Sequence, residues 1–155
     1  LNPSSVAAKV NLGAAAARAG DMKKAVAAWK EVVRAEPGRV DTRLDLANAL
    51  YEAGDIDGAR YHYNQVVLMS PNQAEALNGL GLCYLKGGKY AQAEAAFRSS
   101  IEADPKLMSA YNNLAITLER GGQKAEAIKV LEKAAKLDPD DEDIKKSLQR
   151  MKNGD

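Results

Sequence analysis

Cys83 and His62 are the only cysteine and the only histidine of this 155-residue chain, so catalysis or metal binding is considered there first. A zinc site needs about four such ligands, and a thiol nucleophile needs a base beside the thiol. One residue of each type does not meet either need. The sequence therefore predicts no enzyme, no metal and no cofactor, with Cys83 as a small buried residue and His62 on the surface or its boundary.

The chemistry that remains is that of binding. Asn side chains carry both a donor and an acceptor and can pair with both halves of a peptide group. Carboxylates attract Lys and Arg of a partner, and a few apolar side chains supply anchors. The candidate partner-binding residues are Asp41, Asp45, Asn48, Tyr51, Glu52, Glu75, Asn78, Leu82, Asn112, Asn113 and Ile116.

A period of 34 residues decides where these side chains lie. It separates all five prolines, Pro3, Pro37, Pro71, Pro105 and Pro139, and recurs in Gly20, Gly54, Gly88 and Gly122 and in Ala25, Ala59, Ala93 and Ala127. Independent columns with one period indicate a repeated supersecondary unit.

Each unit reads as a helix, a glycine break, a second helix and a proline. Ala59, Tyr63 and Val66 form the stripe of a helix with one buried face. Glycine suits the left-handed residue after a helix, and Asp21 and Asp55 are good N-caps for the helix that follows. The predicted helix pairs are 5–19 with 22–35, 40–53 with 56–69, 74–87 with 90–103, and 108–121 with 124–137.

The unit resembles the tetratricopeptide repeat, whose pattern is W-x2-L-G-x2-Y, then A-x3-F, then P. Leu80-Gly81-x2-Tyr84, Ala93-x3-Phe97 and Pro105 match it from the Leu onward, and the other units match more loosely. The resemblance implies an all-α, right-handed α-solenoid of antiparallel helix pairs. It also places the candidate binding residues on the concave groove formed by the first helix of each repeat.

One column of the repeat always holds a small residue, and helix packing explains why. Gly13, Ala47, Gly81 and Ala115 are small, which lets the first helix approach the second closely, and a large residue of the second helix fills the space beside each.

Domain boundaries follow from the same period. They are the tail of a preceding repeat at 1–5, four repeats at 6–39, 40–73, 74–107 and 108–140, and a capping helix with the C-terminal tail at 141–155, all in one solenoid domain. In the cap, Ile144, Leu148 and Met151 form one apolar stripe on an otherwise polar helix.

The function this predicts is a non-catalytic protein–protein interaction scaffold that binds an extended peptide or helix of a partner. The alternative is a regulatory or substrate-docking arm of a larger enzyme, for example a glycosyltransferase, or an envelope assembly factor whose other domains are absent. Two known uses of the family fit poorly. No cation stands where chaperone-binding members grip a carboxylate, and only Asn11 and Asn113 occupy the asparagine column of the sugar-transferring members.

Charge separates the classes of partner. Residues 6–39 carry a net charge of +4 and residues 40–73 a net charge of −3, so basic residues are favoured in a partner of the second repeat. A nucleic-acid site would need more cations, with aromatic residues among them, so none is predicted.

No apolar run is long enough to span a membrane. A soluble protein of the cytoplasm or periplasm is expected, and the compartment stays open.

The first repeat generates a prediction. Ala8 and Ala15 hold the columns that Ile144 and Met151 hold in the cap, and a repeat preceding them would cover that face. Weak self-association through this face is therefore expected. Sedimentation at rising concentration should show dimers that Ala15→Glu abolishes, and a wild-type chain that stays monomeric throughout would contradict the prediction.

Overall fold

A computed structural model describes the backbone of residues 3–153 and the side chains of residues 5–153. Within this range the chain forms nine α-helices and no strands. It divides into two compact units, residues 1–71 and residues 72–155, and each is described by itself. Leu1 and Asn2, which belong to the predicted tail at 1–5, lie outside the described residues.

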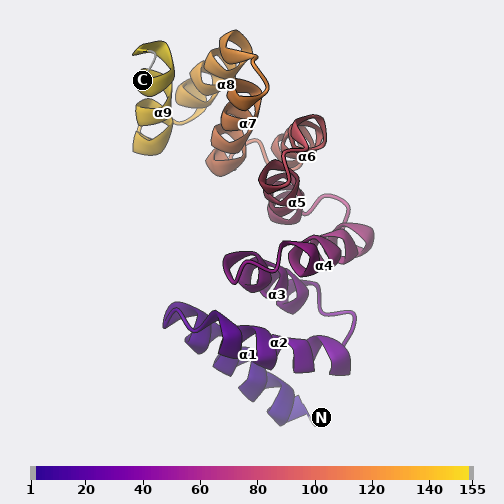
Figure 1. The fold of residues 1–155 in the computed structure, drawn as a ribbon. Helices are drawn as coiled ribbons and strands as arrows, with labels where there is room; N and C mark the ends of the chain where they lie inside the picture. The colour runs from indigo at the N-terminus through magenta and orange to yellow at the C-terminus, as the bar shows by residue number, and fades with distance from the viewer. Residues whose placement is uncertain (1–2, 154–155) are drawn as a thin grey trace. The chain divides into compact units, whose positions relative to one another are not determined.

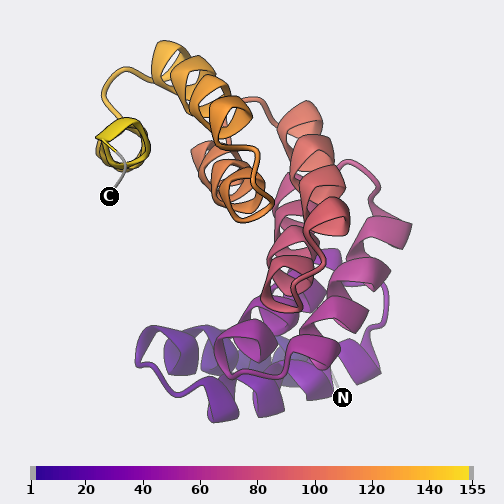
Figure 2. The same ribbon diagram turned by 45° about the horizontal axis from the view of Figure 1, so that its top comes forward.

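The N-terminal unit contains two helix pairs, and the C-terminal unit contains two pairs and a last single helix (Figures 1 and 2). The N-terminal pairs are α1 (Pro3–Arg18) with α2 (Met22–Ala35) and α3 (Val40–Glu52) with α4 (Ile56–Met69). The C-terminal unit has α5 (Ala74–Lys86) with α6 (Tyr90–Ala103), α7 (Met108–Arg120) with α8 (Lys124–Leu137), and α9 (Glu142–Asn153). Helix α1 begins at Pro3, two residues before the predicted start, because proline is tolerated in a first helical turn.

The turn inside each pair has the predicted geometry. Gly20, Gly54, Gly88 and Gly122 all have φ between 70° and 85°, the left-handed region that costs glycine least. Asp21 and Asp55 cap the next helix, since their side chains accept hydrogen bonds from the backbone N–H of Lys24 and Gly58. The predicted N-caps are therefore confirmed.

At Gly13 and Gly81 the first helix of a pair lies directly against a large side chain of the second helix. A Cβ added to Gly81 would lie 2.4 Å from the ring of Phe97, and one added to Gly13 would lie 2.4 Å from the Trp29 indole. Phe97 is completely buried, so its ring has no free space to enter. Where the column holds Ala115, the facing residue of the second helix is the smaller Leu131. In α3 and α4 the same register pairs Ala47 with the large Tyr63, so an alanine in this column also stands opposite an aromatic ring.

The last helix closes the core of the C-terminal unit. Ile144 and Met151 are buried in the same cluster as Tyr111, Leu118 and Leu131, and Leu148 packs against it, which confirms the predicted apolar stripe. Two ion pairs also fix α9, from Arg150 to Glu119 at 2.8 Å and from Lys152 to Glu132 at 2.7 Å. The sequence pattern did not predict these pairs, because it does not say which polar residues of neighbouring helices meet.

The contact between paired helices yields a prediction. Gly81→Ala should lower the free energy of unfolding by about 1 to 3 kcal/mol through overpacking against Phe97, offset in part by the roughly 1 kcal/mol that Ala gains over Gly in a helix. In a Phe97→Leu background the cost should shrink, because an Ala–Leu pair already fills these positions in α7 and α8.

Urea unfolding of the four proteins in this cycle measures the effect. Gly38→Ala is the control, because a Cβ there meets nothing within 4 Å. An equal cost of Gly81→Ala in both backgrounds would show that Phe97 is not the cause.

Candidate functional site

The candidate residues lie on the side of the first helices α3, α5 and α7 that faces away from the paired second helix. The opposite side of these helices is buried through Leu46 and Ala47, Leu80 and Gly81, and Leu114 and Ala115. The close contact with the second helix therefore decides which side chains stay accessible. We call the accessible side the first-helix surface, and it is described separately for each unit.

In the N-terminal unit the first-helix surface is acidic. It belongs to α3 and contains Asp41, Asp45, Asn48, Tyr51 and Glu52. Asp45 is half-buried, and burial raises the pKa of its carboxyl above the ordinary value, as does the neighbouring Asp41 carboxylate one helical turn away. No described cation forms an ion pair with either carboxylate. The ionised Asp45 is therefore held in an unfavourable place that a cation would relieve.

Asn48 is engaged within the unit. Its Oδ1 accepts a hydrogen bond from the hydroxyl of Tyr63 on α4 at 2.7 Å. The whole amide was expected to serve a partner, and one of its hydrogen bonds is made within the unit, to the paired helix. The sequence could not show this, because Tyr63 was identified only as a buried apolar residue.

In the C-terminal unit the first-helix surface combines amides with apolar side chains. Glu75, Asn78 and Leu82 come from α5, and Asn112, Asn113 and Ile116 come from α7. Asn113 Nδ2 donates to Asn78 Oδ1 at 3.0 Å, so the structure brings these two residues together across neighbouring helices. Leu82 and Ile116 are half-buried and lie one helical turn beyond Asn78 and Asn112.

The neighbouring Asn112 is less well satisfied. Its Oδ1 is buried and has no hydrogen-bond partner among the described residues. A buried acceptor without a donor costs stability, about 1 to 3 kcal/mol for a neutral group. Asn112 thus adds to the strained polar groups of this surface.

Two further groups of residues were missed in the sequence. Arg43 of α3 is buried, donates to the Pro37 carbonyl at 2.8 Å, and has its Nη1 3.5 Å from Nδ1 of His62. Burial lowers the pKa of His62, and the charges of Arg43 and Lys30 lower it further.

The second group lines a cavity between α6, α7 and α8. The signal that could have indicated it is the spacing of Lys129, Lys133 and Lys136 on one face of α8.

Cys83 and His62, which were considered first for catalysis or metal binding, do not form such a site. Cys83 is buried in α5, as predicted, and His62 is half-buried in the middle of α4. Among the described residues no cluster of three or more His, Cys, Asp or Glu could hold a metal ion. No helix in the described part of the chain is long and apolar enough to cross a membrane.

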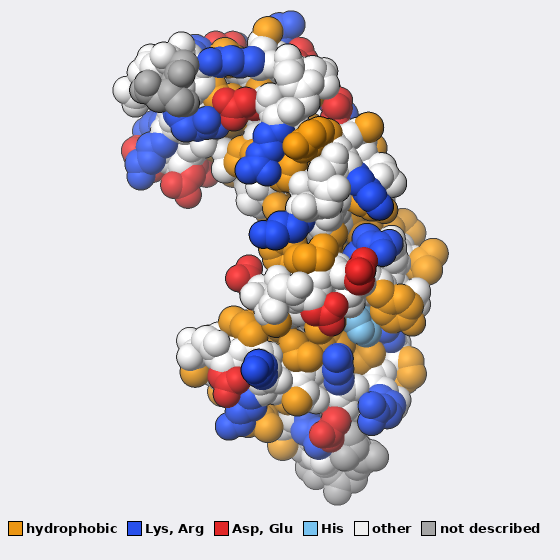
Figure 3. Space-filling model, in the orientation of Figure 1, with side chains coloured by type: hydrophobic (Ala, Val, Ile, Leu, Met, Phe, Trp, Pro, Cys, Tyr) orange, Lys and Arg blue, Asp and Glu red, His pale blue; other side chains and the backbone are white. Residues whose placement is uncertain are grey.

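The surface of the units is mixed in character. On the face shown in Figure 3, hydrophobic side chains lie between positive and negative ones within each unit. Protein-binding surfaces have this mixture, whereas a nucleic-acid site concentrates positive charge along a track.

Helix pairs with a short, glycine-containing turn and a small-to-large contact at each pair define an all-α solenoid. The chain belongs to the tetratricopeptide repeat family, whose model matches residues 1–40, 44–107 and 84–142. This repeat is typical of protein-interaction scaffolds. No curated protein matches the sequence.

Solved structures share the fold at low sequence identity. MamA from Desulfovibrio magneticus RS-1 superposes with a TM-score of 0.84 at 23% identity, over 99% of this chain and 87% of that chain. A tetratricopeptide repeat protein from Parabacteroides merdae gives 0.85 at 23% identity, over 97% of this chain and 59% of its own. TTC0263 from Thermus thermophilus gives 0.81 at 16% identity, over 96% and 82%. At these identities the likeness concerns the fold alone.

The strained carboxyl of Asp45 gives a prediction. Its folded pKa lies above the ordinary value of 3.8, so between these two values the folded protein keeps a proton that the unfolded chain has lost. This contribution to stability is complete below pH 3.8 and is lost as the pH rises through the folded pKa. Asp45→Asn should therefore be more stable than the wild type at neutral pH, with the difference closing in acid.

Urea unfolding at neutral pH and below pH 3.8 tests this. Asp57→Asn serves as the control, because Asp57 is exposed and forms an ion pair with Arg60 at 2.9 Å. It should bring no gain in stability. A loss of stability in Asp45→Asn at neutral pH would contradict the proposed strain.

Proposed function

We propose that this protein is a non-catalytic scaffold that binds an extended peptide or a helix of a partner protein on its first-helix surface. The family supports the scaffold role, and the arrangement of side chains on α3, α5 and α7 supports the choice of surface. On the C-terminal unit a partner segment pairs its backbone with amides and buries apolar side chains beside them. On the N-terminal unit the acidic part favours a segment with Lys or Arg.

The observation that carries the proposal is the Asn113–Asn78 hydrogen bond. It uses one donor of Asn113 and the acceptor of Asn78, so Asn78 Nδ2 and Asn113 Oδ1 are left for other partners. A donor group beside an acceptor group matches the C=O and N–H of a peptide group. The hydrogen bond also holds both side chains in place, which lowers the entropy lost on binding.

Apolar contacts accompany this amide pair. Leu82 and Ile116 are half-buried and lie on the same helix faces as Asn78 and Asn113. A peptide whose backbone meets the amides can therefore place an apolar side chain against these residues. Such small buried anchors usually supply most of the binding energy of an interface.

The N-terminal unit favours positive charge in the partner. Asp41 and Asp45 stand one turn apart on α3 without a described cation between them, and Glu52 is exposed on the same helix. A Lys or Arg of the partner would stabilise the ionised form of Asp45. Binding of a basic segment should therefore weaken as the pH falls and Asp45 takes up a proton.

The test begins with selection of random peptides displayed on phage against the whole chain, followed by titration of a selected peptide. Asn78→Ala with Asn113→Ala should weaken its binding about tenfold, since two hydrogen bonds are lost. The same pair should lower the free energy of unfolding by only about 1 kcal/mol. Binding is measured by calorimetry and unfolding in urea.

Asn64→Ala with Asn72→Ala removes the same number of amides from a second helix and a turn, and should leave binding unchanged. Selection that yields no peptide, or a selected peptide that binds both pairs of variants equally, would overturn the proposal.

A further inference from the structure

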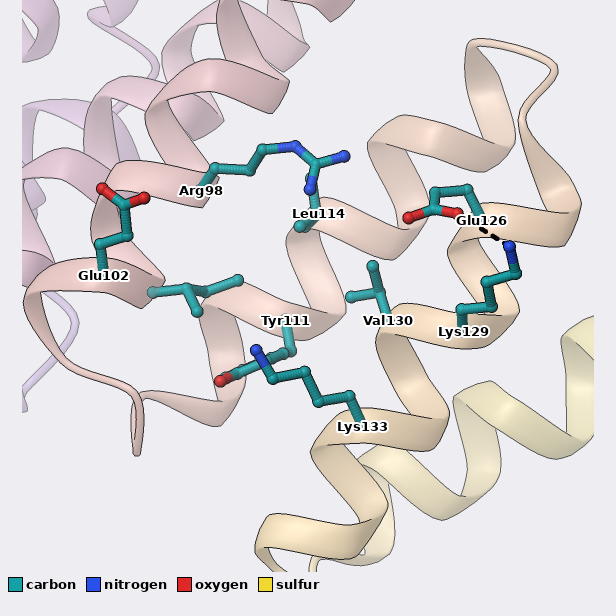
Figure 4. A pocket seen from close by; sticks show the side chains of 9 residues that line it. Arg98, Glu102, Tyr111, Leu114, Glu126, Lys129, Val130 and Lys133 are labelled. Atoms are coloured by element: carbon teal, nitrogen blue, oxygen red, sulfur yellow. Dashed lines mark ion pairs between the residues drawn. The ribbon is translucent and has the colours of Figure 1, made fainter.

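A cavity of about 380 Å³ lies in the C-terminal unit between the second helices α6 and α8, above α7. Its α7 residues, Tyr111 and Leu114, are buried core residues and are not part of the first-helix surface. The cavity is therefore a separate site from the one proposed above. Figure 4 shows Arg98 reaching over it from α6 and Lys133 reaching over it from α8.

The floor of the cavity is apolar. Ile101, Leu114 and Val130 line it from three helices together with the ring of Tyr111. The Tyr111 hydroxyl donates to the Pro105 carbonyl at 3.2 Å, and burial together with the Asp104 carboxylate raises the pKa of the phenol. The hydroxyl thus stays protonated and occupied, and the buried ring adds to the apolar floor. A floor of this kind accepts an apolar side chain.

The rim has positive charge on one side. Arg98 is held by Glu94 at 2.9 Å and Lys129 lies 3.5 Å from Glu126, the pair marked in Figure 4. Lys133 lies over the Tyr111 ring, 5.9 Å from its centroid, and forms no ion pair among the described residues. Lys129, Lys133 and Lys136 share one face of α8, whereas the α6 rim ends in Glu102. A negatively charged segment is therefore favoured along α8.

The same position in the N-terminal unit is built differently. Counting back two repeats, Arg43 stands in place of Tyr111 and His62 in place of Val130, and these two side chains approach each other to 3.5 Å. Polar groups thus occupy the place where the C-terminal unit has its apolar floor. The combination of an apolar floor and a lysine rim does not follow from the repeat itself.

We propose that the cavity between α6, α7 and α8 is a second docking site, which takes one apolar side chain from an acidic segment of a protein partner. The apolar side chain packs on Ile101, Leu114 and Val130. Carboxylates beside it meet Lys129 and Lys133. The first-helix surface of the N-terminal unit favours basic residues, so the two sites select segments of opposite charge.

Methyl chemical shifts of the whole chain report directly on this site. The probe is an acetylated and amidated peptide of sequence Asp-Asp-Leu-Asp-Asp, which should shift the methyl signals of Ile101, Leu114 and Val130 in a saturable way. The peptide with Ser in place of Leu, and the peptide with Lys in place of each Asp, should bind more weakly. Added salt should weaken binding of the acidic peptide.

Lys129→Gln with Lys133→Gln should weaken the acidic peptide by about threefold to tenfold, since exposed charges contribute modestly. Lys124→Gln with Lys146→Gln is the matched control, with the same change of charge on exposed lysines away from the cavity. Ile101→Phe fills the cavity from α6 and should abolish the methyl shifts of Leu114 and Val130, with thermal melting as the check of folding.

Three results would overturn the proposal. They are no shift of the cavity methyls with the Leu peptide, equal binding of the Lys-flanked peptide, and equal effects of the two lysine pairs. None of these results bears on the first-helix surface, because Asn78 and Asn113 report on that site independently.

Discussion

The contact between a small residue of each first helix and a large residue of its paired second helix fixes the rest of the structure. A missing Cβ at Gly81 is what lets the helix backbone reach the ring of Phe97, and Gly13 does the same for Trp29. Once this side of the first helix is buried, the opposite side remains as the accessible surface. The position of the binding residues is thus a consequence of packing.

Most of the fold could be predicted from the sequence because its causes are local and repeat. A glycine with positive φ, an aspartate cap and an apolar stripe each act within a few residues. The 34-residue period shows the glycine and the stripe four times and the aspartate cap twice, at Asp21 and Asp55. The family and the helix bounds follow from these features to within about two residues. The right-handed sense of the solenoid was expected only from the resemblance to the tetratricopeptide repeat.

The site could be predicted only as a set of positions on helix faces. Which polar side chains meet depends on rotamers and on the offset between helices, and the period does not contain this information. Asn78 and Asn113 were both expected on the surface, yet their mutual hydrogen bond was not. Asn48 was expected to face a partner with its whole amide, and Tyr63 takes its acceptor. Ser100 is a similar case, because its buried hydroxyl donates to the Ala74 carbonyl at 2.8 Å in a column that other repeats fill with Val or Ala.

Polar groups that cost stability lie on both kinds of helix, and Trp29 Nε1 on the second helix α2 is one of them, buried without a hydrogen-bond partner among the described residues. On the first helices, burial and the Asp41 carboxylate raise the pKa of Asp45, and Asn112 keeps a buried acceptor without a donor among the described residues. Other carboxylates lie beside a cation, namely Glu119 on the first helix α7 and Glu94, Glu126 and Glu132 on second helices. A residue that weakens the folded chain is expected where its cost is recovered on binding a partner. Of these groups, Asp45 lies on the first-helix surface and is only half-buried, so a cation of a partner can recover its cost there.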